Sequence, residues 1–405
     1  MANTIQFKGY GRQDGRKGIR NVIVVAYLVE CAHHVTRRIV NVVDDIDVQL
    51  IGFPGCYPNQ YAYDMMRAVS THPNVGGALL ISLGCESMNR DKLLTEIRAS
   101  GRPAELLVIQ EAGGTKSTIE AGVAAIARIK VEADKAQRVS MDLSELIVGT
   151  ICGGSDGTSG ISANPAVGRC FDALVEANAT CIFEETGELI GCETIMADRA
   201  VTPELGVEIE ACVAKAENYY RIMGFGSFAP GNADGGLTTM EEKSMGAYSK
   251  SGSSPISGLI KPGDIPPAGG LYLLDVVPDG EPRFGFPNIS DNAEIIELIA
   301  CGSHVILFTT GRGSVVGSAI SPVIKVCANP ETYRRLSEDM DVNAGRILEG
   351  EATLDEVGEE ILQNVIDVAS GKRSVSEELG HQEFILTYKS FEPIGPSCLP
   401  VRLVG

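Results

Sequence analysis

Hydrophobic positions over the first third of the chain alternate between short apolar runs and longer amphipathic stretches. The apolar, β-branched runs predict strands at residues 22–29, 48–53, 77–83 and 106–109. The stretches between and after them have helical spacing and predict helices at residues 32–43, 60–70, 88–100 and 117–133. Because strand and helix alternate strictly, right-handed crossovers and a parallel sheet are expected.

A second series follows a charged stretch at residues 131–142, which we interpret as a linker. It predicts strands at residues 146–151, 180–183, 271–277, 304–308 and 323–326. It predicts helices at residues 165–178, 203–223, 292–301 and 354–370. Residues 224–270 are rich in Gly, Ser and Pro and are too long for an ordinary connection, which favours a functional loop.

The predicted fold class is therefore α/β, with two Rossmann-like parallel-sheet units and a long Gly-rich functional loop. The first unit is an N-terminal α/β domain over residues 1–135. The second is a C-terminal α/β catalytic domain over residues 145–405, and it contains the loop at residues 224–270.

Composition narrows the possible partners. The 405-residue chain has a formal net charge of −19, which disfavours nucleic acid and anionic membrane surfaces. An anionic substrate would need a local basic site. Because the chain shows neither a signal peptide nor an apolar run of the ~20 residues that span a bilayer, a cytoplasmic location is expected. Its eleven cysteines are then expected to be core residues, metal ligands or nucleophiles.

Three cysteines share one local pattern. Cys56, Cys85 and Cys152 each follow an apolar strand and precede a polar, Gly-containing turn. In parallel sheets such positions lie at the carboxyl ends of strands, where α/β enzymes bind ligands. Three thiolates that meet there would favour iron, zinc or an iron–sulfur cluster and leave a coordination position for substrate. The alternative is that all three are small residues at tight strand ends.

Four Gly-rich segments are candidate anion cradles, although none has the spacing of a Walker A motif or a dinucleotide fingerprint. They are residues 9–21, 113–117, 153–160 and 309–314. Hydroxyls, backbone amides and guanidinium groups in such turns can bind carboxylate or sulfonate. The predicted substrate-binding residues are Arg16, Arg20, Ser155, Asp156 and Arg312. Each segment could equally be an ordinary turn.

Two candidates for acid–base chemistry stand out. Glu184, Glu185 and Glu188 cluster just after a predicted strand, and Lys243 lies in the long loop. A buried lysine can have its pKa lowered enough to act as a base. We therefore take Lys243 and Glu185 as the predicted catalytic residues, with a solvated charge run as the alternative for either.

The assembled motifs resemble the altronate/galactarate dehydratase family along nearly the whole chain. The matching segments are residues 11–21, 72–76, 83–86, 152–165, 230–246 and 310–314. Other segments resemble the large subunits of the sulfolactate-cleaving branch of that family. These are residues 27–34, 52–59, 183–193, 276–288 and 380–389.

The resemblance implies cleavage of 3-sulfolactate to pyruvate and sulfite, with dependence on iron. The one-chain sugar-acid dehydratases carry a small domain before the motif that starts here at Gly9, so a separate small (alpha) subunit and a hetero-oligomer are implied. Where those dehydratases have Lys-Ala, this chain has Ala233 and Asp234, which fits a changed substrate.

The resulting hypothesis is a metal-assisted β-elimination. The metal, Fe²⁺ or alternatively a [4Fe-4S] cluster held by the three cysteines, would chelate the carboxylate and 2-hydroxyl of an anionic small molecule. Lys243 or Glu185 would remove the C2 proton, and the arginines would grip the sulfonate and carboxylate. Two alternatives stay open: a sugar-acid dehydratase that expels water, and a non-catalytic binding subunit in which the cysteines are merely packed.

Overall fold

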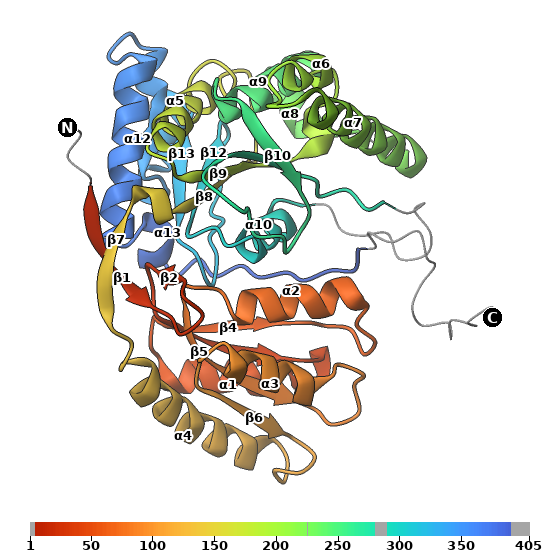
Figure 1. The fold of residues 1–405 in the computed structure, drawn as a ribbon, viewed down its shortest axis with the longest axis vertical. Helices are drawn as coiled ribbons and strands as arrows, with labels where there is room; N and C mark the ends of the chain where they lie inside the picture. The colour runs from red at the N-terminus through yellow and green to blue at the C-terminus, as the bar shows by residue number, and fades with distance from the viewer. Residues whose placement is uncertain (1–4, 225, 280–289, 390–405) are drawn as a thin grey trace. The chain divides into compact units, whose positions relative to one another are not determined.

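The computed structural model describes residues 5–224, 226–279 and 290–389, which form two compact units (Figure 1). The four-stranded unit comprises residues 9–139, 278–279, 290–296 and 382–389. The seven-stranded unit comprises residues 5–8, 140–224, 226–277 and 297–381. Most of the segment 276–288 and the last sixteen residues of the predicted C-terminal domain, 390–405, lie outside the described residues.

The four-stranded unit is a parallel α/β sheet covered by helices, as the alternating sequence pattern predicts. Its strands are β3 (Val22–Tyr27), β4 (Val48–Gly52), β5 (Val75–Ser82) and β6 (Ala104–Val108), in the order β4-β3-β5-β6. Its helices are α1 (Glu30–Val43), α2 (Gln60–Ser70), α3 (Arg90–Ala99) and α4 (Thr115–Ala133). Apolar residues of α1 and α4 share one buried core with β3 and β5.

The seven-stranded unit is also built on a parallel sheet. Its strands are β8 (Ile147–Cys152), β9 (Thr180–Phe183), β10 (Ile256–Ile260), β11 (Gly270–Leu274), β12 (Val305–Thr310), β13 (Val323–Cys327) and β14 (Val342–Asn343). They run in the order β10-β11-β9-β8-β12-β13-β14, and neighbouring strands are parallel. Every residue of β11, β12 and β13 is buried, which explains why these strands are continuous apolar runs. The α/β fold class is therefore confirmed.

Helices of the seven-stranded unit flank this sheet. They are α5 (Ala163–Glu176), α6 (Glu193–Ala197), α7 (Pro203–Met223), α8 (Pro230–Asp234), α9 (Met240–Tyr248), α11 (Pro330–Arg335), α12 (Leu354–Ala369) and α13 (Val375–Glu378). Short 3₁₀ helices are η1 (Leu143–Glu145), η2 (Thr186–Glu188), η3 (Ser249–Ser251), η4 (Ser337–Asp339) and η5 (Ala344–Ile347). Figure 1 shows α5 beside α12, and α10 (Asp291–Ala300) has residues in both units.

The interpretation of residues 131–142 as a linker is wrong. The stretch contains the end of α4 and strand β7 (Arg138–Asp142), which joins β1 (Gln6–Gly11) and β2 (Lys17–Gly18) in a small sheet of order β2-β1-β7. Met141 is the one buried residue of β7, and its other side chains are exposed or half-buried. Hydrophobic pattern alone therefore gives little signal for it.

The prediction of a long loop at residues 224–270 is also wrong, because the segment contains α8, α9, η3 and β10. Its glycines serve close packing. A Cβ atom on Gly160 would lie 2.8 Å from the Cα atom of Gly246 in α9, so the two backbones meet directly. The hydroxyl of Thr239 caps α9 by accepting a hydrogen bond from the Glu242 amide.

In the part of the chain that the structure describes, no helix is both long and apolar enough to cross a lipid bilayer.

Candidate active site

Cys152 lies at the carboxyl end of β8, in the middle of the seven-stranded sheet, and is buried. Its backbone amide donates to Oε2 of Glu185 at 3.0 Å. Its sulfur lies 3.5 Å from Oε1 of Glu185 and 3.3 Å from Oε2 of Glu188, and the Ser155 hydroxyl donates to the sulfur at 3.4 Å. A thiol and two carboxylates thus converge at the sheet edge where α/β proteins bind ligands.

Two lysines complete this arrangement, which we call the Cys152 cluster: Cys152, Glu185, Glu188, Lys243 and Lys250. Lys250 forms an ion pair with Glu185, and Lys243 forms one with Glu188. The first pair is 1% and 3% exposed at its side chains, and the second is 5% and 19% exposed. Lys243 also donates to the Ser227 carbonyl at 2.6 Å. Each buried carboxylate therefore has a cationic partner, as burial of charge requires.

The two carboxylates are brought together by local backbone geometry. Glu185 has φ 72°, in the left-handed region, and directly precedes the 3₁₀ turn η2. A side chain three residues ahead in such a turn lies on the same side, so Glu188 faces the same thiol. A non-glycine residue with this φ carries strain, and such strain is concentrated at functional sites.

Burial shifts the acid–base behaviour of this cluster. It raises the pKa of Glu185 to about 7; Lys250 opposes this shift and Glu188 adds to it. Burial also raises the pKa of the Cys152 thiol well above its usual value, and the charges of Glu185 and Glu188 raise it further. Without a bound cation, Cys152 is therefore a protonated thiol near neutral pH, and Glu185 is poised between its two protonation states.

The physical reason for choosing Lys243 from the sequence, a pKa lowered by burial, is wrong. Burial does lower the pKa of Lys243, but Glu188, Cys152 and Glu185 together raise it above the usual value of a lysine. The pKa of Lys250 is raised in the same way, chiefly through Cys152 and Glu185 against the effect of burial. Both lysines are consequently ammonium groups, which suits them to stabilise anions.

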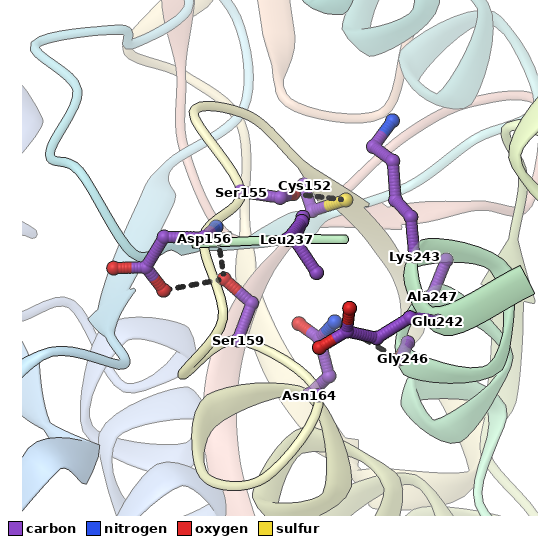
Figure 2. Close-up of a pocket in the computed structure, with 11 residues that line it drawn as sticks. Cys152, Ser155, Asp156, Ser159, Asn164, Leu237, Glu242, Lys243, Gly246 and Ala247 are labelled. Carbon is purple, nitrogen blue, oxygen red and sulfur yellow. Dashed lines mark hydrogen bonds between the residues drawn. The ribbon is translucent and has the colours of Figure 1, made fainter. Parts of the chain in front are cut away.

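A small pocket opens beside the cluster (Figure 2). Its empty space is about 210 Å³, including some that is open to solvent. It lies between the loop that follows β8, the start of α5 and helix α9. The lining residues are Cys152, Ser155, Asp156, Ser159, Gly160, Asn164, Leu237, Glu242, Lys243, Gly246 and Ala247. The enclosed part of this space has room for about one water molecule, so a substrate would also occupy the part that is open to solvent.

The predicted anion cradle at residues 153–160 borders this pocket. The Asp156 carboxylate in it forms hydrogen bonds that stabilise the loop. Oδ1 of Asp156 accepts from the amide and hydroxyl of Thr158 at 2.9 and 2.5 Å, and Oδ2 accepts from Asn329 at 3.0 Å. Arg312 is exposed and donates to the Gly231 carbonyl. The substrate-binding roles of Ser155, Asp156 and Arg312 stay predictions.

The other predicted site residues belong to the four-stranded unit. Cys56 and Cys85 are exposed in the loops after β4 and β5, and the Ser87 amide donates to the Cys56 carbonyl at 2.8 Å, which joins the two loops. Arg16 donates to Asp14 and Arg20 to the Ile19 carbonyl. Cys152 belongs to the seven-stranded unit, so the meeting of the three cysteines stays a prediction.

Two members of the Cys152 cluster were not among the predicted site residues. Glu188 was noted only as part of a run of acidic residues, although its three-residue spacing from Glu185 was a usable signal. Lys250 gave no signal, because nothing in the sequence around it indicates burial. Its role depends on η3, which carries it to Glu185.

The donor atoms of this site are chemically suited to a divalent transition metal. The Cys152 sulfur and carboxylate oxygens of Glu185 and Glu188 lie within 4.8 Å of one another. Sulfur and carboxylate oxygen are ligands that iron and zinc accept. Three such ligands would leave a position for substrate.

Comparison with known proteins places this chain in a family. The family model for D-galactarate/altronate dehydratase, C-terminal, matches residues 143–391, and the model for D-galactarate dehydratase/altronate hydrolase, second domain, matches residues 9–134. Similar proteins include (2R)-sulfolactate sulfo-lyase subunit beta of Chromohalobacter salexigens, which is 34% identical over 94% of this chain and 97% of the subunit.

Two sugar-acid dehydratases are similar over a comparable share of the chain. Altronate dehydratase of Bacillus subtilis is 32% identical over 90% of this chain and 74% of that protein. Galactarate dehydratase (L-threo-forming) of Escherichia coli is 32% identical over 91% of this chain and 73% of that enzyme. The chain belongs to the D-galactarate/altronate dehydratase family, the family to which its sequence motifs pointed.

Proposed function

We propose that this chain is the large catalytic subunit of a lyase that cleaves (2R)-3-sulfolactate into pyruvate and sulfite. Support comes from the similarity to a sulfo-lyase subunit beta, which covers 97% of that subunit. The word "subunit" in that protein's name supports a separate small (alpha) subunit as partner of this chain, and so a hetero-oligomer.

The observation that carries the proposal is the Cys152 cluster beside a small pocket. It supplies a buried carboxylate whose pKa is raised to about 7, and it places two ammonium groups within reach of the same thiol. A general base works best when its pKa lies near the working pH. Cations held in a buried site stabilise developing negative charge strongly.

In the proposed reaction, Glu185 removes the proton from C2 of the substrate. The electron pair of that C–H bond forms the C2=C3 double bond, and the C3–S bond breaks so that sulfite leaves with the bonding pair. The enol of pyruvate then takes a proton at C3 and becomes the ketone. Lys243, which lines the pocket, stabilises the anionic carboxylate and enolate. Lys250 holds Glu185 in place.

The cofactor is part of the proposal: Fe²⁺, or alternatively a [4Fe-4S] cluster. Cys152 is common to both possible ligand sets. A set with Cys56 and Cys85 leaves Glu185 to act as the base, whereas in a set with Glu185 and Glu188 the Glu185 carboxylate would be a ligand and could not be the base. When bound, the metal would supply Lewis-acid polarisation of the substrate carboxylate and 2-hydroxyl, which acidifies the C2 hydrogen. Arg16, Arg20 and Arg312 are the proposed contacts for sulfonate and carboxylate.

A second candidate is a sugar-acid dehydratase acting on altronate or galactarate. The specific observation in its favour is 32% identity to an altronate dehydratase and to a galactarate dehydratase over at least 90% of this chain. The same proton abstraction would then expel water from C3, and the product would be a 2-keto-3-deoxy acid.

The experiment that tests the proposal is co-expression with a neighbouring small subunit, anaerobic purification and assay with each substrate. We expect sulfite and pyruvate in equal amounts from 3-sulfolactate. A 2-keto-3-deoxy acid from altronate or galactarate, without sulfite release, would establish the second candidate. An assembled, iron-loaded complex that converts none of the three substrates would refute both.

A further inference from the structure

Asn164 has a side chain whose hydrogen bonding is incomplete. The residue is 2% exposed and lies in the first turn of α5. Its Nδ2 donates to the Gly246 carbonyl at 2.9 Å, whereas its Oδ1 is enclosed and accepts no hydrogen bond from the described residues. Because a carbonyl must face the nitrogen, the Gly246 contact fixes which amide atom is the unused acceptor.

This acceptor belongs to the pocket beside the Cys152 cluster. Figure 2 shows the Asn164 amide pointing into the space between the β8–α5 loop and α9, which Glu242 also lines. Oε2 of Glu242 accepts from the amide and hydroxyl of Thr238, both at 2.7 Å. Its Oε1 accepts no hydrogen bond from the residues that the structure describes.

The pocket therefore has two chemically different groups of lining residues. Cys152, Ser155 and Lys243 offer a thiol, a hydroxyl and an ammonium group. Asn164 offers an enclosed acceptor oxygen that lacks a donor among the described residues, and Glu242 offers an exposed carboxylate. A carboxylate or sulfonate placed against Glu242 would be repelled, whereas a hydroxyl would donate the hydrogen bond that Asn164 Oδ1 lacks.

We propose that Asn164 and Glu242 form a hydroxyl subsite, in which Asn164 Oδ1 accepts the hydrogen bond of a substrate hydroxyl. The anionic groups of the substrate then lie toward Lys243. Since Oδ1 is enclosed, a side chain that lines the pocket moves before a hydroxyl reaches it. The inference rests on the proposed function, because it assigns a place to the hydroxyl of a hydroxy acid.

Binding of matched ligand pairs tests this subsite without requiring turnover. The pairs are malate with succinate and galactarate with adipate, which differ only in their hydroxyl groups. Isothermal titration of the assembled complex should show tighter binding of the hydroxylated member in at least one pair. Asn164→Ala should reduce that preference roughly fivefold to tenfold, the range expected for one hydrogen bond, with little effect on the deoxy ligand.

Ser249→Ala is the matched control, because the Ser249 hydroxyl donates to the same Gly246 carbonyl at 2.7 Å. It removes a contact to this carbonyl but leaves Oδ1 of Asn164 unchanged, so the ligand preference should persist. Thermal melting confirms that both variants are folded. The subsite would be overturned if Asn164→Ala weakened the binding of the hydroxylated and the deoxy ligand equally. It would also be overturned if the wild type bound both members of each pair with equal affinity. Failure of the sulfite and keto-acid assays alone would instead count against the proposed function.

Discussion

Two charged regions of this molecule use their charges in opposite ways. In the Cys152 cluster, Glu185 and Glu188 pair with Lys250 and Lys243 around a thiol, next to a pocket. In the N-terminal part of the four-stranded unit, arginines donate mainly to backbone carbonyls. We call this second region the arginine network: Arg12, Arg102 and Asp14.

The arginine network ties the N-terminal segment to the loop at residues 71–75. Arg12 donates to the carbonyls of Pro73 and Arg20 at 2.8 and 2.9 Å. Arg102 donates to the carbonyls of Val75 and His72, both at 3.0 Å, and to Asp14 at 3.0 Å. Carbonyls at strand ends need donors, and guanidinium groups supply several at once.

The comparison shows that a concentration of charge does not by itself identify a site. The basic segment at residues 9–21 stood out in the sequence, yet the hydrogen bonds of Arg12 and Asp14 within it stabilise the four-stranded unit. The Cys152 cluster contains fewer charges, but they converge on a reactive group beside open space. Substitutions should therefore affect activity in one region and stability in the other.

The largest effect is expected for Glu185→Gln. Loss of the proposed base should lower kcat by about 10²–10⁴-fold, measured by steady-state release of sulfite or keto acid. Glu176→Gln, on the exposed end of α5, is a control that should leave kcat unchanged. Retention of more than half of the wild-type kcat in Glu185→Gln would refute its role as the base.

Lys250→Met should destabilise the seven-stranded unit by about 3–5 kcal/mol, because it leaves the buried carboxylate of Glu185 without its cation. Urea denaturation measures this free energy of unfolding. Lys243→Met should cost less, since Glu188 is 19% exposed and can be solvated. If the two variants are equally stable, the buried pair has no special structural importance.

Iron binding distinguishes the two possible ligand sets. Cys152→Ser should weaken iron binding by at least about 10–100-fold in either case, as measured by metal analysis after anaerobic reconstitution. Loss of iron in Cys85→Ser but not in Glu188→Gln supports the three-cysteine site, and the reverse supports the group within the seven-stranded unit. Cys170→Ser, in the core of α5, is the control. Full activity of the wild-type complex in the absence of iron would exclude both ligand sets.

Arg102→Met should lower the free energy of unfolding by about 2–3 kcal/mol, the range for lost charge-assisted hydrogen bonds. The kcat per folded molecule should stay at the wild-type value, because the arginine network is structural. If Arg102→Met has normal stability but a strongly reduced kcat, the arginine network takes part in catalysis and is not merely structural.

The smallest effect concerns Asp14 and acid stability. Burial raises the pKa of Asp14, but hydrogen bonds from Arg16 and Arg102 and their charges lower it, for a net value of about 2. Since this pKa lies below the ordinary 3.8, the stabilisation is complete above about pH 4 and is lost as pH falls toward 2. Asp14→Asn should reduce the change in the free energy of unfolding between about pH 4 and pH 2 by about 1 kcal/mol.

Periodicity in the sequence was sufficient to predict most of the regular elements. α2, β9 and α7 have the same first and last residues as predicted, because each has an uninterrupted apolar pattern and a clear boundary. α9 and β10 were missed, because glycine and serine dominate their segment. There the glycines permit close backbone contact with the β8–α5 loop, which only the tertiary structure reveals.

The candidate site was predictable only in part, for a related reason. Cys152 and Glu185 follow strands, and strand ends can be located from the apolar pattern. The partner of Glu185 is Lys250, 65 residues away in the chain, and no local pattern connects the two. The pKa of Lys243 was predicted with the wrong sign, because the carboxylate that faces it could not be identified from sequence.

The fate of the C2 hydrogen tests the central claim most directly, that the Cys152 cluster abstracts this hydrogen to start an elimination. The assembled complex is given 3-sulfolactate, altronate and galactarate that carry deuterium at C2, and the label is followed by NMR. We predict that the accepted substrate loses its C2 deuterium to solvent as the keto acid forms. In Glu185→Gln, neither the loss of deuterium nor the formation of keto acid should occur. Formation of the keto acid at the wild-type rate in Glu185→Gln would contradict the account.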